Sequence, residues 1–358
     1  MRPLSIALIA KSNGAGLSAD AELLRGVLTS FGHTTFDVDP YSASMSIPRA
    51  DVGFFLETVA PHLIDRVRCP IGILNLEWFE PEWFDHLHRF VQFWSKTYCA
   101  HETLLRLGVP SHYTGFASRD LLDASVPRTL TCLHVKGQSP LKNTDAILAA
   151  WDMAPDLPLL TIVSKLPVRP RPNVRCLPPL RQADLSLVMN AAEIHICPSS
   201  TEGWGHYITE AMSVMATIVT TDGPPMNEHL DASSGILVPP SGARPRPLQW
   251  PVTPEQVLSK VRAALTTPMV DLFDGELDRI LFERTAPDRP DRSDRSRLPS
   301  LAIEYAVDPR SIAAAVRAAA SLSPTGRRAL GYNARQRLLE RNAAFRRRVF
   351  TLLGQLQA

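Results

Sequence analysis

The chain has 358 residues, a net charge of +2, and 45% hydrophobic against 21% charged residues, which suits a soluble two-domain protein and argues against nucleic acid as a partner. No run approaches about 18 uninterrupted apolar residues, so we expect a cytoplasmic protein that does not cross a membrane. The five cysteines include no Cys-x-x-Cys pair, which predicts free thiols in a reducing compartment.

The first part of the chain alternates short apolar runs with helical patterns. Strands are expected at residues 5–10, 33–38, 52–56, 71–74 and within 91–98, and helices at 19–31 and 100–107. Gly32 and Gly108 follow the two helices and are expected to end them. This repetition of β and α predicts a Rossmann-like α/β domain over residues 1–120.

A glycine-rich loop follows the first expected strand. Gly14, Gly16 and Ala19 formally match the Gly-x-Gly-x-x-Ala dinucleotide fingerprint, although the turn before Gly14 is longer than the fingerprint allows. Asp37 or Asp39 lies near the distance at which an acid would bind a ribose, so an NAD-dependent oxidoreductase stays open as an alternative. The same two aspartates spell an Asp-x-Asp metal motif, but no ligand-rich partner follows, and no metal site is predicted.

Acids and aromatic residues gather after the strand expected at 71–74, where open α/β sheets bind their ligands. Asn75, Glu77 and Trp78 are the candidates in this loop. Glu77 could accept hydrogen bonds from a hydroxylated ligand and Trp78 could stack on it, or both could pack beneath the loop. His86 and His88 are not predicted as a metal pair, because residues two apart on a helix do not share a face.

A second α/β series follows a stretch without periodicity at 113–127, and a second domain is expected over residues 121–335. Its strands are expected at 130–135, 159–163, 194–197 and 217–220, and its helices at 146–151, 182–192 and 206–215. Crowded prolines and alternating charges predict an insertion at 241–300, with short helices at 254–265 and 272–282 and a mobile charged loop.

The end of the chain is expected to be a helix, residues 336–358, that packs back on the first domain. The region is rich in basic residues, at Arg327, Arg328, Arg335, Arg337, Arg341, Arg346, Arg347 and Arg348. Such a helix could contact anionic lipid at the inner membrane face, although a solvated face is the favoured interpretation.

The densest chemistry lies in residues 194–228. Gly203 and Gly205 let the backbone approach a ligand, and the helix that follows them presents an N-terminus that favours an anion such as a diphosphate. Glu202 and Glu210 flank this anion site, and carboxylates, which only accept hydrogen bonds, suit a neutral polyol. A nucleotide sugar offers a diphosphate, a ribose diol and hexose hydroxyls together.

The sequence Pro-Ser-x-x-Glu-Gly-Trp-Gly-x-x-x-x-Glu-Ala-Met in this segment resembles the donor-site signature of retaining GT-B glycosyltransferases of the family 4 type, the group 1 glycosyl transferases. The resemblance implies that Glu202 contacts the transferred sugar and Glu210 the ribose hydroxyls. It implies further that the backbone of Gly203, Trp204, Gly205 and the following His206 meets the diphosphate, which the loop with Gly14 and Gly16 would face from the first domain.

Two loops depart from the family's pattern. Family members place Arg and Lys five residues apart on the leaving diphosphate, and here Lys142 matches the Lys while Gly137 occupies the Arg position. Lys136 or Gln138 could substitute, although an ammonium does not reproduce a guanidinium fork. Pro224–Pro225 stands where the family usually carries Gly-Gly and has no N–H to donate. A non-catalytic protein that binds nucleotide sugars or glycans therefore stays open.

The resemblance implies an α/β fold of the GT-B type, with two Rossmann-like domains facing an interdomain cleft. The expected reaction is retaining transfer of a hexose from a UDP-, GDP- or ADP-sugar to a hydroxyl of a glycan, lipid-linked or small-molecule acceptor. Glu202 and Lys142 are the predicted catalytic residues, and Asn75, Glu77 and Trp78 lie on the acceptor side. Asn75 and Glu77 stand near the position where related enzymes often carry a cleft histidine. No metal or cofactor is expected, because the helix N-terminus and Lys142 would stabilise the leaving diphosphate.

Overall fold

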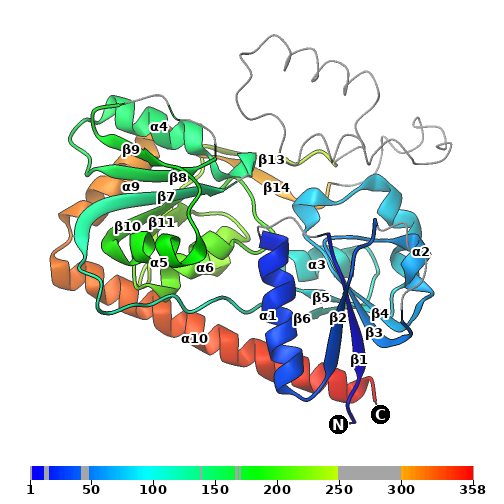
Figure 1. The fold of residues 1–358 in the computed structure, drawn as a ribbon. Coiled ribbons are helices and arrows are strands. Elements are labelled where there is room, and N and C mark those ends of the chain that lie inside the picture. Colours follow the sequence, from blue (N-terminus) through cyan, green and yellow to red (C-terminus); the bar gives the residue numbers. More distant parts are fainter. Residues whose placement is uncertain are drawn as a thin grey trace.

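The computed structural model describes residues 2–11, 16–41, 48–137, 139–165, 168, 171–248 and 300–357. These residues form two six-stranded sheets, each covered by helices, as the expected α/β fold requires (Figure 1). The helices expected at 254–265 and 272–282 and the charged loop after them lie outside the described residues, as do Gly14 and Gln138.

The first sheet has the strand order β2-β1-β3-β4-β5-β6, and every pairing in it is parallel. Its strands are β1 Ser5–Ile9, β2 Thr34–Val38, β3 Ala50–Leu56, β4 Val67–Ile73, β5 Gln92–Ser95 and β6 Ser111–Tyr113. Its helical elements are α1 Gly16–Ser30, α2 Pro61–Ile64, η1 Leu76–Trp78, η2 Pro81–Arg89 and α3 Tyr98–Arg106. The chain changes direction across the sheet between β1 and β3, and the loops after these two strands therefore meet at one edge.

The second sheet has the order β12-β11-β10-β7-β8-β9, again with parallel pairings throughout. Its strands are β7 Thr129–Gly137, β8 Leu160–Ser164, β9 Val174–Leu177, β10 Ala192–Cys197, β11 Thr217–Thr221 and β12 Ile236–Val238. Its helical elements are η3 Pro140–Lys142, α4 Thr144–Met153, α5 Gln182–Ala191, α6 His206–Ser213, η4 Met226–Glu228 and α9 Pro309–Ser321. The reversal of strand order lies between β7 and β10, which places the loops after these strands side by side.

A single helix, α10 Pro324–Gln355, runs along both halves of the molecule (Figure 1). Ala334 and Leu338 belong to a buried cluster of the second half, whereas Phe345 and Val349 belong to the core of the first. Gly331 allows the close approach, because a Cβ there would lie 2.1 Å from the carbonyl oxygen of Met215. The helix begins well before residue 336, where the sequence placed the start of the crossing helix.

The two ends of the expected insertion are paired. Strands β13 Gly242–Pro245 and β14 Ile303–Ala306, neither of which the sequence predicted, form an antiparallel ladder. Tyr305 of this ladder donates its N–H to Ser200 O at 2.8 Å. The ladder therefore rests against the loop that follows β10.

The halves are also joined through η4, which closes the loop containing Pro224–Pro225. Both carboxylate oxygens of Glu228 accept hydrogen bonds at the N-terminus of α3, from Tyr98 N at 2.7 Å and Cys99 N at 2.8 Å. The carboxylate satisfies two N–H groups that have no partner within the helix, and its negative charge complements the helix dipole. Within the described residues no helix is long and apolar enough to span a membrane.

Candidate active site

The loops after β7 and β10 are bonded to each other at the reversal of strand order in the second sheet. Ser200 N donates to Leu141 O at 2.8 Å, and Asn143 Nδ2 donates to Pro198 O at 2.7 Å. These bonds hold the short helix η3, which ends at Lys142, against the loop that carries Glu202. Two residues predicted from separate motifs are thus brought to one place.

Glu202 and Lys142 lie in a desolvated environment. Ser199 Oγ donates to Glu202 at 2.6 Å, and burial raises the pKa of Glu202 although Lys142 opposes the shift. Lys142 Nζ lies 3.9 Å from the centre of the Tyr207 ring and donates to Val135 O at 3.2 Å. Burial lowers the pKa of Lys142, and Glu202 counteracts it. Each group therefore supports the charge of the other.

Gly137 occupies a backbone conformation that suits glycine. Its φ is +59°, which L-residues with a side chain rarely adopt, and a Cβ built there would lie 3.5 Å from Lys142 Nζ. The local backbone conformation therefore favours glycine at this position over the Arg of the family's pattern. Lys136, on β7 one residue earlier, is half-buried, and Gln138 is outside the described residues.

The N-terminus of α6 is prepared to receive an anion. Gly205 is its N-cap with φ +84°, and no side chain caps the first turn. The N–H groups of the first turn therefore lack a capping oxygen from this residue, and the helix dipole adds positive potential.

His206, the first residue of α6, reaches across to the first half. Its Nε2 donates to Asp20 Oδ1 at 2.7 Å, and Lys96 Nζ donates to Asp20 Oδ2 at 2.5 Å. Asp20 and Lys96 are each only 2% exposed. Burial alone would raise the pKa of Asp20, but the charge of Lys96 and the bond from His206 hold it below its usual value. Sequence reasoning missed Asp20 and Lys96, because neither belongs to a motif.

Asn75, one of the predicted acceptor-side residues, contacts Gly203 of the loop after β10, which we call the donor loop. A Cβ on Gly203 would lie 2.2 Å from Asn75 Cγ, so the two residues are in contact, and Asn75 Oδ1 is buried without a hydrogen-bond partner. Glu77 is 5% exposed, and burial together with the neighbouring Glu57 raises its pKa to about 8. Burial likewise raises the pKa of Glu57 to about 7, against the opposing charge of Lys96.

Glu57 itself was not predicted from the sequence. It follows β3, at the carboxyl end of a central parallel strand, with φ 53°. An acid directly after a buried apolar strand was the available signal, because such positions line the ligand site of open sheets.

The two tryptophans of the prediction are engaged by protein groups. Trp204 is 3% exposed, its ring packs in the core of the first half, and its Nε1 donates to Ser118 Oγ at 3.1 Å. Only its backbone is therefore available to a donor. The guanidinium of Arg246 lies 5.2 Å from the centre of the Trp78 ring and donates to Glu77 O at 2.8 Å. Arg246 thus covers one face of the Trp78 ring, and a ligand could not stack on that face.

Glu210 lies one turn into α6 and its side chain is 13% exposed. Its carboxylate is 3.9 Å from Arg119 Nη1, and Arg119 also pairs with Glu22 of α1 at 2.5 Å. Gly16 is the first residue of α1. Glu210, the residue expected to bind the ribose, therefore lies beside an arginine that bridges to the first half.

Both aspartates of the Asp-x-Asp sequence have polar partners within the first half. Asp37 forms an ion pair with Arg25, and Asp39 accepts the N–H of Tyr41 at 2.9 Å. Among the described residues, no group of three or more His, Cys, Asp or Glu side chains is placed to hold a metal ion.

Comparison with known proteins places this geometry in context. Residues 168–244 match the family described as glycosyl transferases group 1. Among solved structures, sucrose-phosphate synthase from Thermosynechococcus elongatus superposes with a TM-score of 0.64 at 13% identity, over 99% of this chain and 99% of that one. HepE from Anabaena, in complex with UDP and glucose, gives 0.62 at 11% identity, over 98% and 100% of the two chains.

A third structure, of the GtfA/B complex, gives a TM-score of 0.53 at 13% identity and covers 94% of this chain. This chain spans 60% of the length of that one. No curated protein matches the sequence. At these identities the structural likeness establishes the fold.

Proposed function

We propose that this chain, a GT-B glycosyltransferase with a group 1 segment, transfers a hexose from a nucleoside-diphosphate sugar to a hydroxyl acceptor with retention. The observation that carries the proposal is the junction of the Glu202 loop, Lys142 and the N-terminus of α6 at the reversal of strand order. Ligands of open parallel sheets bind at such a point.

The donor would be oriented by three kinds of group. The diphosphate would lie on the backbone N–H groups from Gly203 into α6, where the dipole and free donors favour an anion. Glu210 would accept hydrogen bonds from the ribose diol, and Glu202 from the hexose hydroxyls. HepE was solved with UDP and glucose, which favours a UDP-sugar among the candidate donors.

Lys142 would act on the leaving group. Its ammonium is desolvated and held by a carbonyl and an aromatic face, so it is fixed before the reaction begins. A preorganised cation gains in interaction energy as charge develops on the diphosphate, which is how it would lower the barrier without a metal. Since Gly137 supplies no side chain, Lys142 carries more of this role than in family members with an Arg there.

The acceptor would enter from the first half. Asn75, Glu57 and Glu77 bring an amide oxygen and two carboxyl groups to the donor loop. The amide and carboxyl oxygens accept hydrogen bonds, and a protonated carboxyl can also donate one. The lining thus suits a hydroxyl-rich acceptor.

A ligand panel tests the class of protein. Thermal shifts with UDP-, GDP- and ADP-glucose and with NAD should show stabilisation by one nucleotide sugar and none by NAD. Stabilisation by NAD alone would favour the oxidoreductase alternative, and binding without turnover the non-catalytic one. The anomeric configuration of the product by NMR tests retention, and full activity in a chelator tests metal independence.

Glu210→Ala tests the donor geometry within the same panel. It should weaken binding of both the sugar nucleotide and the bare nucleoside diphosphate by about 1 to 3 kcal/mol, because ribose hydroxyls lose their acceptor. Glu22→Ala is the matched control, since it removes the other carboxylate from Arg119. Equal losses in the two variants would assign the effect to Arg119 and remove Glu210 from the ribose.

A further inference from the structure

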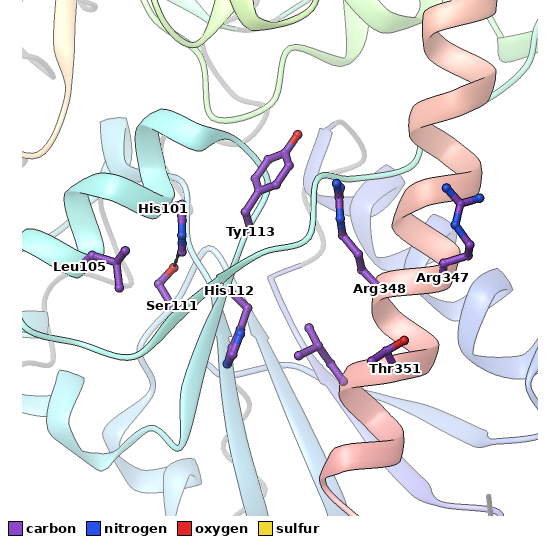
Figure 2. A pocket seen from close by; sticks show the side chains of 9 residues that line it. His101, Leu105, Ser111, His112, Tyr113, Arg347, Arg348 and Thr351 are labelled. Carbon is purple, nitrogen blue, oxygen red and sulfur yellow. Dashed lines mark hydrogen bonds between the residues drawn. The ribbon is translucent and has the colours of Figure 1, made fainter.

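A pocket of about 610 Å³ is lined by residues of α3, β6 and α10, and no predicted site residue is among them (Figure 2). Its volume is within the range of pockets that hold small molecules. The lining residues come from two distant parts of the chain: His101, Leu105, Ser111, His112, Tyr113, Arg347, Arg348, Thr351 and Leu352.

The lining is basic. It holds two arginines and two histidines, and no aspartate or glutamate is among the lining residues. Arginine stays protonated at any physiological pH, so the pocket is positive whatever the state of the histidines. Thr351 adds a hydroxyl group, which can donate to an anion.

One arginine is fixed and the other is free. Arg348 donates from Nη1 to Thr114 O at 3.2 Å, and its guanidinium lies 4.7 Å from the centre of the Tyr113 ring. Arg347 is exposed and makes no hydrogen bond or ion pair with any residue that the structure describes. By contrast, Arg335 and Arg337 on the same helix pair with Asp120 and Asp231. Arg347 thus has its full donor capacity available to a ligand.

His101 is held in the wall of the pocket by a hydrogen bond. His101 lies 3.0 Å through Nδ1 from Ser111 Oγ, which also contacts Ser95 Oγ at 2.8 Å (Figure 2). Burial and the charge of His112 lower the pKa of His101, while Glu102 opposes this. An anion in the pocket would offset both unfavourable effects, so anion binding and protonation would reinforce each other.

We propose that this pocket binds a phosphate-bearing ligand, either a soluble phosphate ester or the headgroup of an anionic phospholipid. Arg347 and Arg348 supply guanidinium groups that suit phosphate oxygens, and Thr351 adds a hydroxyl donor. Exposed Leu105, with 50% of its surface accessible, borders the pocket and would face acyl chains in the lipid case. The inference does not depend on the proposed transfer reaction.

Thermal unfolding with inorganic phosphate, against sodium chloride of equal ionic strength, is the first test. Phosphate should stabilise the full-length protein, and Arg347→Ala should weaken its binding about tenfold or more, since a charge-assisted bond is lost. Because Arg347 is exposed and unpaired among the described residues, this variant should fold. Arg328→Ala, an exposed arginine elsewhere on α10, is the matched control and should bind as the parent does. No stabilisation by phosphate, or equal losses in both variants, would refute a built site.

Vesicles separate the two sources of phosphate. Co-sedimentation with phosphatidylglycerol vesicles but not with phosphatidylcholine vesicles, lost in Arg347→Ala and retained in Arg328→Ala, would identify a headgroup. Stabilisation by glucose 6-phosphate without vesicle binding would identify a soluble ester. Vesicle binding that both variants lose equally would reflect the charge of the whole helix and overturn the assignment to the pocket.

Discussion

The buried carboxyl of Glu77 predicts that the protein becomes less stable as pH rises from about 5 to 8. Burial and the adjacent Glu57 raise the pKa of Glu77 from 4.5 to about 8. Below pH 4.5 the group is protonated in the folded and unfolded states alike. Between 4.5 and 8 the unfolded chain releases the proton and the folded chain retains it, so the folded state binds more protons and stability falls with pH.

The size of the effect follows from the same shift. Each tenfold change in proton affinity corresponds to about 1.4 kcal/mol, so a pKa raised from 4.5 to about 8 gives at most roughly 5 kcal/mol. Glu57 lies close enough to share this cost, since its own pKa is raised to about 7. Removing one of the two acids therefore relieves the other as well.

Glu77→Gln tests this reasoning, because the amide has nearly the shape of the protonated carboxyl and does not titrate. Thermal unfolding followed from pH 5 to 9 should give similar midpoints near pH 5. By pH 8.5 the variant should be more stable than the parent by several degrees. Glu102→Gln, at an exposed position of α3, is the control and should follow the parent. Parallel curves for the parent and Glu77→Gln would show that Glu77 is not held protonated in the folded protein.

Two further substitutions probe the donor side of the candidate active site. Lys142→Ala should lower kcat at least tenfold in steady-state assays, because removing a charge directed at the transition state typically costs about 10²- to 10³-fold. An unchanged rate would separate Lys142 from the leaving group, and Lys136→Ala tests for a second cation. Gly203→Ala should destabilise the protein by about 1 to 3 kcal/mol, since the new Cβ would lie 2.2 Å from Asn75 Cγ. Adding Asn75→Ala should restore the stability measured by thermal unfolding, and a double variant no better than Gly203→Ala would exclude this crowding as the cause.

Local patterns predicted most of the two α/β series. The helix expected at 206–215 is observed as α6, and it ends earlier because Met215 has φ 57° and leaves the helical conformation. The helix expected at 100–107 begins at Tyr98, because Thr97 serves as its N-cap and accepts from Ala100 N at 3.2 Å. Periodicity gives the existence of an element, while the capping residue gives its boundary.

Contacts between distant segments were not predictable in this way. Asp20 and Lys96 are 76 residues apart, and His206 is 186 residues from Asp20, so no spacing rule links them. Trp204 was assigned to the ligand site through its backbone, and the place of its ring in the core of the first half was not predicted. The donor loop is local and carries a recognisable motif, whereas the surface that meets it is assembled only by the fold.

The ionisation of the donor loop depends on this assembled surface. Burial disfavours the carboxylate of Glu202, and Lys142, Ser199, His206 and Lys96 oppose that effect. Lys96 belongs to the first half, and Asp20 links it to His206. Among the described residues of the second half, Lys142 and His206 favour the carboxylate of Glu202 by charge, and Lys96 of the first half adds to them. Burial is the largest influence on the pKa of Glu202 and Lys96 the smallest of those named, so the first half adjusts the charge of the donor loop, while Lys142 supplies the main opposition to burial.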